Sequence, residues 1–407
     1  MGGCPACVDR ARWELSRGEE NAIRNTPLLR LGGYLVPPTP QRMGADPSVT
    51  GRGVTMAFVD SGFSLHPDLC LPTPRIKAYL DVGDPSASVA DLAAPDILGW
   101  HGTMTSVVAA GSGFLSFGMY RGIASGAELV LVRVSNDRGR QPDRHIVKGL
   151  DWLLEHRVRL GLRIVNISLR GDAGTTGKGP VEQRIAALTK AGCLVVAASG
   201  NEMADTLHPP ASCPDAITVG GLDDGKADHA PPALYHSNWE KRPAQGRKPE
   251  VVAPALFVAS PILPGTDIFR QSRWIAAALL AEGKERRRIA QRQKRLLGIP
   301  EPILEAGGKV LLAYLQEFAK QQKVIGPYYH HAEGTSVAAP IVTSIAAQMI
   351  EVAPFLGPAE LKELLIMSAS PVEGELPERQ GYGVVSAARA VALARQVAMR
   401  GRPALFR

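Results

Sequence analysis

The 407-residue chain has few cysteines and no obvious long apolar segment. Its five cysteines are an odd number, and no spacing among them suggests a disulfide framework of the kind found in small secreted domains. We expect no apolar run to approach the roughly 18 residues that a membrane span requires. The first thirty residues carry charges throughout and lack the apolar core of a secretory signal. These absences predict a cytoplasmic protein without membrane association.

A metal site is also not predicted near the N-terminus. Cys4 and Cys7 have the spacing of half a zinc site or of a redox pair. No second cysteine pair and no histidine-rich segment follows nearby. Two reduced thiols in a terminal segment are therefore favoured over a metal or redox centre.

The composition that remains is that of an ordinary globular protein, with 45% hydrophobic and 21% charged residues. Strand-like apolar runs at residues 127–134, 163–167 and 193–198 alternate with helical patterns. This alternation predicts an α/β fold, doubly wound around a mainly parallel β-sheet that is flanked by helices. The length allows either two average domains or one long α/β domain.

Three distant segments supply residue types that work together in nucleophilic catalysis. Ser336 follows a small-residue turn and begins an apolar helical pattern, where unpaired N–H groups favour negative charge. Asp60 ends a strand-like apolar run, and His101 opens a stretch of small and β-branched residues that predicts a buried helix. Alone, each residue is more simply a helix cap, a turn former or a loop residue. Their chain order, Asp then His then Ser, is one of the orders known for a Ser-His-Asp triad.

The sequence resembles the catalytic domain of the subtilisin-like serine proteases over residues 50 to 396. The resemblance is carried by eight blocks in the order of that family: AFVDSG (57–62), HPDL (66–69), HGT (101–103), NISL (166–169), ASGN (198–201), VAP (252–254), GTSVAAP (334–340) and GYG (381–383). Because the blocks occur together and in order, the resemblance is far more specific than any one of them. It implies a subtilisin-like fold.

The resemblance also implies roles for individual residues. Ser336 would be the nucleophile, His101 the general base, and Asp60 the group that orients the imidazole. Asn201 would donate to the oxyanion together with the backbone N–H of Ser336.

Substrate-binding residues are implied by the same comparison. Ser168, Leu169, Arg170 and Gly171 match the segment that pairs with extended substrate. The family usually has glycine where this chain has Arg170, so that side chain either narrows the cleft, meets an acidic substrate residue, or points to solvent. Glu202 is a candidate for the floor of the first specificity pocket, where it would favour a basic residue, and residues 208–210 resemble the opposite wall.

The resemblance divides the chain into an N-terminal extension (1–45), a catalytic domain (46–396) and a C-terminal tail (397–407). Residues 34–38 loosely resemble the short segment that blocks the cleft in intracellular subtilisins. We therefore hypothesise that residues 1–40 restrain activity, and a proline-rich entry to the domain is an equal alternative.

An insertion of helical character interrupts the catalytic domain at residues 267–325. The pattern predicts two helices, at 269–297 and 309–323, joined by a turn with Pro300 and Pro302 into a helical hairpin that overhangs the cleft. Its twelve Lys/Arg against six Asp/Glu concentrate the positive charge of the chain, most densely at 284–295. A solvated helix face or an acidic protein partner is expected there, rather than a nucleic acid, because no nucleic-acid motif accompanies the run.

No cofactor is expected. Asp68 matches an acid that helps to hold a structural calcium ion in many relatives, but residues 111–122, which would supply the other oxygens, contain no carboxylate. Calcium needs six or more oxygen ligands, so a strong site is not predicted.

The sequence thus predicts a serine endopeptidase that hydrolyses polypeptides through an acyl-enzyme. Two alternatives stay open. One is a catalytically restrained scaffold that acts as a binding module, and the other is acyl transfer to an acceptor other than water.

Overall fold

The computed structural model describes residues 36–94, 96, 98–171, 179–227, 230–243 and 246–400. The strands of the main sheet are β1 Thr55–Asp60, β2 Ile76–Asp81, β3 Glu128–Arg133, β4 Leu162–Ile167, β5 Leu194–Ala198, β6 Ala216–Asp223, β7 Ala233–Leu234 and β8 Val251–Pro254. They form one eight-stranded sheet in the order β2-β3-β1-β4-β5-β6-β7, with β8 also paired to β6. All pairs are parallel except β6 with β7. The predicted α/β class and mainly parallel sheet are confirmed.

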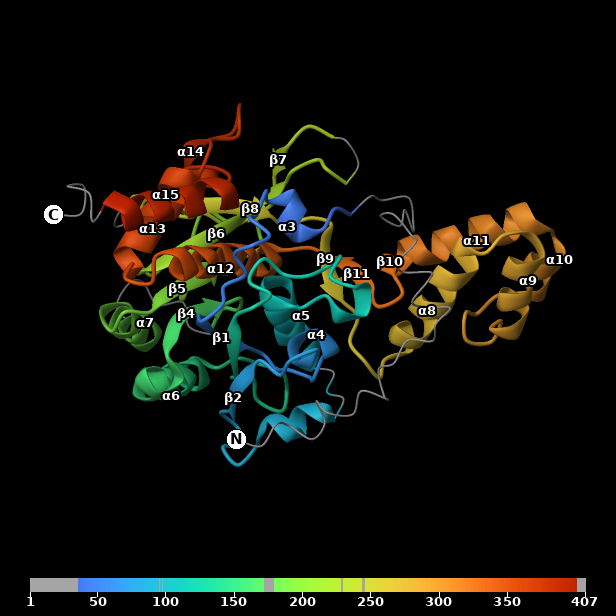
Figure 1. Cartoon of the computed structure of the whole chain (residues 1–407), viewed down its shortest axis with the longest axis horizontal. Helices are drawn as coiled ribbons and strands as arrows, with labels where there is room; N and C mark the ends of the chain where they lie inside the picture. The colour runs from blue at the N-terminus through green and yellow to red at the C-terminus, as the bar shows by residue number, and fades with distance from the viewer. Residues whose placement is uncertain are drawn as a thin grey trace.

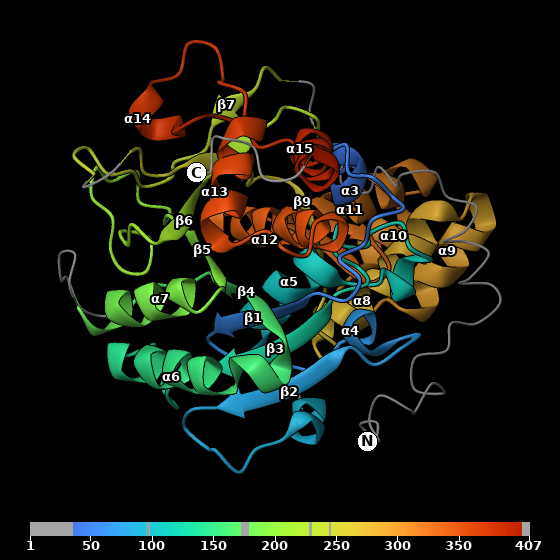
Figure 2. The same ribbon diagram turned by 60° about the vertical axis from the view of Figure 1, so that its left-hand side comes forward.

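Helices cover both faces of this sheet (Figures 1 and 2). One face packs against α5 (Gly99–Ala110) and α12 (Thr335–Val352), and the other against α6 (Asp143–Leu160) and α7 (Pro180–Lys190). A strand such as β1 is buried at all six positions, since it is covered on both sides. That burial explains why its four central residues, 56–59, are all apolar rather than alternating with polar ones.

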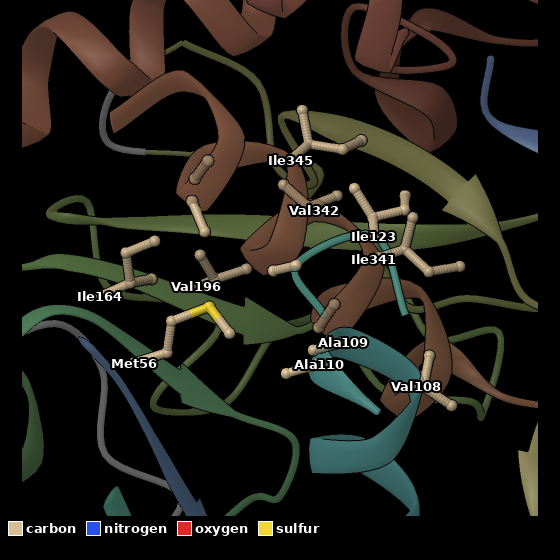
Figure 3. Close-up of a cluster of buried hydrophobic side chains, with 14 of the residues drawn as sticks. Met56, Val108, Ala109, Ala110, Ile123, Ile164, Val196, Ile341, Val342 and Ile345 are labelled. Carbon is tan, nitrogen blue, oxygen red and sulfur yellow. The ribbon is translucent and has the colours of Figure 1, made fainter. Parts of the chain in front are cut away.

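The core between the sheet and its first helical layer is built from aliphatic side chains (Figure 3). Met56, Ile164 and Val196 extend from three neighbouring strands toward Ile341 and Ile345 of α12. All five side chains are essentially inaccessible to solvent. Burial of each such side chain contributes about 1.5–3 kcal/mol to folding, so this layer holds the N-termini of α5 and α12 firmly against the sheet.

Helix α12 corrects one expectation from the sequence. By length and composition it is apolar enough to cross a membrane, contrary to the expectation that no segment approaches that length. However, 83% of the helix is buried inside the protein. It is therefore the central core helix of the domain, and its apolarity reflects contact with protein on every side.

Three helices follow α12 in the chain: α13 Pro358–Ser368, α14 Pro377–Gln380 and α15 Ala387–Arg400. Of these, α13 and α15 contact α12. The first part of the chain also contains two short helices, α3 Thr39–Arg42 and α4 Pro67–Cys70. It has 3₁₀ turns at Val89–Ala93 and Phe114–Ser116.

The insertion has more helices than the predicted hairpin. It contains four helices rather than two: α8 Asp267–Leu280, α9 Gly283–Arg292, α10 Glu301–Glu305 and α11 Gly308–Gln321. The predicted first helix breaks at Ala281 and Glu282, which are extended, and at Gly283, whose φ is +49°. Figure 1 shows these helices, in yellow and orange, gathered at one end of the molecule.

The insertion has its own apolar cluster, which includes Ile275, Ala290, Leu304 and Leu315. It is joined to the rest by a small second sheet in the order β10-β11-β9, made of β9 Val258–Pro261, β10 Val324–Gly326 and β11 Tyr329–Ala332. Strand β11 leads directly into α12, so the root of the insertion lies close to the helix that carries Ser336.

The N-terminal extension is described only from Val36 onward. Val36 packs with Leu115, Tyr328 and Tyr329, away from the catalytic residues. Arg42 is anchored to Asp224 by two hydrogen bonds of 2.7 and 2.6 Å. Residues 36–40 do not line the active-site pocket described below, and the hypothesis for residues 1–35 lies outside the described residues, as do Cys4 and Cys7.

Candidate active site

Asp60 and His101 form a hydrogen-bonded pair at the carboxyl end of β1, a central strand of the main sheet. The carboxylate lies at the end of β1 and is 1% exposed, and its Oδ1 is 2.7 Å from Nδ1 of His101 in the first turn of α5. The backbone N–H of Ser61 and the hydroxyl of Thr105 also donate to Asp60, at 2.7 and 3.2 Å. Asp60 is thus fixed from three sides, and Nε2 of His101 is left to face the pocket.

The electrostatics of the pair suit a general base. Burial alone lowers the pKa of His101, but the charge of Asp60 and its hydrogen bond outweigh that effect and raise the pKa above its ordinary value. A carboxylate that accepts from Nδ1 also selects the tautomer in which Nε2 is free to take a proton.

Gly102 allows α5 to begin close to β1. A side chain at this position would overlap the carbonyl oxygen of Gly62 and the ring of Phe63. The first turn of α5 can therefore rest directly on the turn that follows Asp60, and this contact brings the imidazole within reach of the carboxylate.

Ser336 lies in the first turn of α12, after Gly334 with φ of +121°. Its hydroxyl donates to the carbonyl of Ser168 at 3.2 Å, and the Ser168 hydroxyl donates to the carbonyl of Ser336 at 3.3 Å. The carbonyl of Ser336 is available for the second bond because Pro340, four residues later, has no N–H to donate to it. Within the described residues the Ser336 hydroxyl is thus bonded to Ser168 rather than to His101.

Asn201 is held by the start of the same helix. Its side-chain oxygen accepts from the backbone N–H and the hydroxyl of Thr335, at 2.9 and 3.0 Å. With the oxygen occupied in this way, the amide nitrogen is the end that remains to donate into the pocket.

All of the predicted site residues line one pocket of about 670 Å³. These are Asp60, His101, Ser168, Leu169, Arg170, Gly171, Asn201, Glu202 and Ser336. His208 and Pro210, predicted to form a wall, line it as well. Hence segments that are as much as 276 positions apart in the chain (60 to 336) meet at one place, as the order of the motifs indicated.

Arg170 and Glu202 contact each other across this pocket. Nη1 of Arg170 is 3.6 Å from Oε1 of Glu202, and both side chains are more than half exposed. Of the alternatives for Arg170, the structure therefore favours a position in the cleft. Partial burial raises the pKa of Glu202, but hydrogen bonds from Asn238 and from the N–H of Asn201, with the charge of Arg170, lower it overall.

Asn238 and Thr335 belong to the site but were not predicted. Asn238 donates to Glu202 at 2.5 Å and accepts from the backbone N–H groups of Glu202 and Ala204. It lies in an irregular loop without any sequence signal. Thr335 lies inside the GTSVAAP block, so its contact with Asn201 had a signal in the sequence that the predictions did not use.

Comparison with known proteins places this constellation in a family. The model of the subtilase family matches residues 51–383. The chain belongs to the subtilase family. It is 28% identical to the serine protease AprX of Bacillus subtilis (strain 168) over 354 residues, which cover 84% of this chain and 67% of AprX. It is 34% identical to subtilisin BL of Lederbergia lenta over 176 residues, or 43% of this chain and 58% of that protein.

Solved structures of similar fold agree. The protease domain of PatA aligns with a TM-score of 0.56 at 22% identity, over 86% of this chain and 98% of that one. Fervidolysin from Fervidobacterium pennivorans, a keratinolytic enzyme related to subtilisin, aligns with a TM-score of 0.58 at 20% identity, over 86% of this chain and 44% of its own. Membership of the subtilase family and the likeness to the serine protease AprX make the protein a subtilisin-like serine endopeptidase, a hydrolase.

Asp68, the candidate calcium ligand of this subtilase, has protein partners. Its Oδ2 accepts from the hydroxyl of Tyr329 at 2.8 Å, and its Oδ1 accepts from the N–H of Leu115 at 3.3 Å. Among the described residues no cluster of three or more His, Cys, Asp or Glu side chains could hold a metal. The donors around Asp68 therefore fit a hydrogen-bonded carboxyl better than a calcium ligand.

Four basic side chains of the run at 284–295 bond to other residues of the insertion. Arg286 and Arg287 donate to the carbonyls of Ala278 and Leu304 near the ends of two helices. Arg288 pairs with Glu285, and Lys294 with Glu301. Four of the seven basic side chains predicted as a partner surface thus stabilise the insertion, and the hypothesis of an acidic protein partner gains no support.

Proposed function

We propose that this subtilase cleaves polypeptides through Ser336, His101 and Asp60 acting as a catalytic triad. The observation that carries the proposal is the 2.7 Å Asp60–His101 hydrogen bond, in one pocket with a serine at the N-terminus of a core helix. The hydroxyl of Ser336 would leave the carbonyl of Ser168 by rotation about χ1 and turn toward Nε2 of His101. The substrate carbonyl would then be attacked as the proton passes to the imidazole.

Charge that develops on the substrate carbonyl oxygen would be met by two donors. One is the side-chain amide of Asn201, oriented by Thr335, and the other is the backbone N–H of Ser336 in the first turn of α12. His101 would return its proton to the leaving amine, and Asp60 would stabilise the imidazolium that exists between these steps. Water then hydrolyses the acyl-enzyme by the same route.

The substrate would bind as an extended strand along Ser168–Gly171, which line the pocket. Glu202 would give this pocket a fixed negative charge because Asn238 and the N–H of Asn201 hold its carboxylate. A basic side chain before the scissile bond would replace Arg170 as the partner of Glu202.

A burst experiment tests the acyl-enzyme. With a p-nitrophenyl ester, the wild-type protein should release p-nitrophenol in a burst equal to the amount of enzyme and then turn over slowly. Ser336→Ala should lose the burst and about 10⁶-fold in kcat. Ser344→Ala is the matched control, since Ser344 lies on the same helix and donates to Ile341 in the core. A burst that persists in Ser336→Ala would assign the nucleophile to another residue.

We also propose that the protein works in the cytoplasm without a resident cofactor. The three described cysteines, Cys70, Cys193 and Cys213, carry reduced thiols and are buried. Burial raises the pKa of Cys193 to about 11, so its thiol stays protonated and unreactive. Such thiols suit a reducing compartment.

A further inference from the structure

A second cavity of about 370 Å³ lies between the catalytic domain and the root of the insertion. Trp100, Ile262, Leu263 and Ile268 supply most of its lining, with His330 and Asp96 at its sides. Ile262 and Leu263 follow β9, just before the insertion, and Ile268 is the second residue of α8, so the start of the insertion supplies part of the lining. It shares no lining residue with the active-site pocket.

The cavity nevertheless adjoins the active site through a single side chain. Trp100 directly precedes His101, and the two rings have centroids 6.2 Å apart with the edge of one toward the other. On its other side Trp100 meets the ring of His330 at 5.7 Å. The Trp100 indole therefore separates His101, the proposed general base, from the cavity.

The two titratable side chains that line the cavity, Asp96 and His330, present no unpaired charge to it. Asp96 pairs with Arg133 at 2.7 Å. Burial above all, with the charges of His331 and Lys323, lowers the pKa of His330 to about 4, so the imidazole is neutral at pH 7. Nε2 of His330 is buried and has no hydrogen-bond partner among the described residues. The cavity thus offers an apolar surface whose two titratable side chains present no unpaired charge.

On the basis of the proposed function, we propose that this cavity binds an apolar side chain of the substrate on the leaving-group side of the scissile bond. The acyl side of the substrate would occupy the pocket along Ser168–Gly171, whereas the leaving amine departs past His101, which gives it a proton. An extended chain advances about 3.3 Å per residue, so one of the first few residues beyond the bond reaches past Trp100. Leu, Ile, Met or Phe fits the lining.

Quenched fluorescent peptides of one acyl-side sequence provide the test. The second and third residues after the scissile bond are varied among Leu, Phe, Ala, Lys and Asp. We expect kcat/KM to be at least tenfold higher for Leu or Phe than for Asp at one position, the low end of what an apolar pocket discriminates. Equal rates for all residues after the bond, or a preference confined to residues before it, would overturn the proposal.

A chromogenic p-nitroanilide with the same acyl side separates this proposal from the proposed function. Its leaving group contains no amino acid, so it does not fill the cavity. If the wild-type protein cleaves the p-nitroanilide and shows no preference after the bond, only the cavity proposal fails. If it cleaves neither substrate class, the proposed function of Ser336, His101 and Asp60 as an active triad fails.

Ile268→Asp tests the cavity directly. Ile268 is the second residue of α8, where an acid is compatible with the helix dipole, so folding should tolerate the change. The ratio of kcat/KM for Leu over Lys substrates should fall to about one or below, because the introduced carboxylate removes apolar lining and attracts a lysine side chain. Leu280→Asp at the other end of α8 is the control and should keep the wild-type ratio, because Leu280 is partly exposed and lies outside the cavity. An unchanged ratio in Ile268→Asp would contradict the assignment, and the ratio does not depend on how much protein is folded.

Discussion

At the scale of one residue, Asp60 accepts a hydrogen bond from Nδ1 of His101, which selects the tautomer of the ring and helps to raise its pKa. Since only neutral imidazole acts as a base, the raised pKa places the acidic limb of the pH–rate profile higher than an ordinary histidine would. Removing the charge of Asp60 should lower the pKa of His101 again.

Asp60→Asn should therefore lower kcat by about 10⁴-fold, the effect known for the aspartate of this triad type. In the residual activity the acidic limb of kcat/KM against pH should move to lower pH. A pH–rate profile of both proteins checks this. A limb that stays in place, or moves to higher pH, would contradict the role given to Asp60.

Arg170 and Glu202 differ in how firmly they are held. Glu202 has two hydrogen bonds besides the 3.6 Å pair with Arg170. Because both side chains are over half exposed, their pairing stabilises the fold by only about 0–1 kcal/mol. A basic substrate side chain can therefore displace Arg170 at little cost.

Arg170→Ala should raise kcat/KM for substrates with Lys or Arg before the scissile bond, by about three- to tenfold, because a competitor for Glu202 is removed. Glu202→Gln should remove the preference for basic residues. Peptide-library profiling of the three proteins measures both effects. If Glu202→Gln keeps a basic preference, another residue sets the specificity.

At the scale of elements, the site depends on how closely α5 and α12 approach the strands. Gly102 lets α5 rest on the turn after β1. Gly102→Ala should destabilise the protein by about 1–3 kcal/mol through overpacking and should reduce activity by more than its effect on stability explains. Gly308→Ala is the control, since a side chain there meets nothing within 4 Å. Equal behaviour of the two variants in thermal unfolding would contradict this packing argument.

The contact of α4 with β11 is the second element-scale test. Tyr329 and Asp68 are both buried, and their 2.8 Å hydrogen bond occupies an oxygen that a calcium ion would need. Tyr329→Phe should lower the free energy of unfolding by about 1–3 kcal/mol, the cost of an unsatisfied buried acceptor. The melting temperature of the wild-type protein should not change with EDTA or added Ca²⁺. A rise with Ca²⁺ would instead indicate a cation at Asp68.

Elements with a long continuous apolar run were predictable from the sequence. Strands β1, β3, β4 and β5 and the core helix α12 lie where apolar runs indicated them, because burial on both sides imposes continuous apolarity. The four-helix insertion was not predictable as such. Its break at Ala281 and Glu282 has no proline to mark it, and the left-handed Gly283 could equally have lain within a helix.

At the scale of the whole molecule, the motifs predicted which residues meet but not how they are oriented. The pairing of Asp60 with His101 agrees with the expected relay, whereas the hydroxyl of Ser336 is bonded to Ser168. Side-chain direction depends on local rotamers and on competing acceptors, which no spacing in the sequence encodes. The contacts of Arg170 and Asn238 with Glu202 were hidden for the same reason.

The fold brings the ends of β1, α5 and α12 to one pocket, and the central claim is that this convergence activates Ser336. The most direct measurement is the rate of labelling by a fluorophosphonate, with the modified residue identified by mass spectrometry. We predict one adduct per chain, on Ser336, whose formation slows as His101 is protonated and is largely lost in Asp60→Asn. Labelling that is absent in the wild-type protein, falls on another residue, or proceeds equally well without Asp60 would contradict the account.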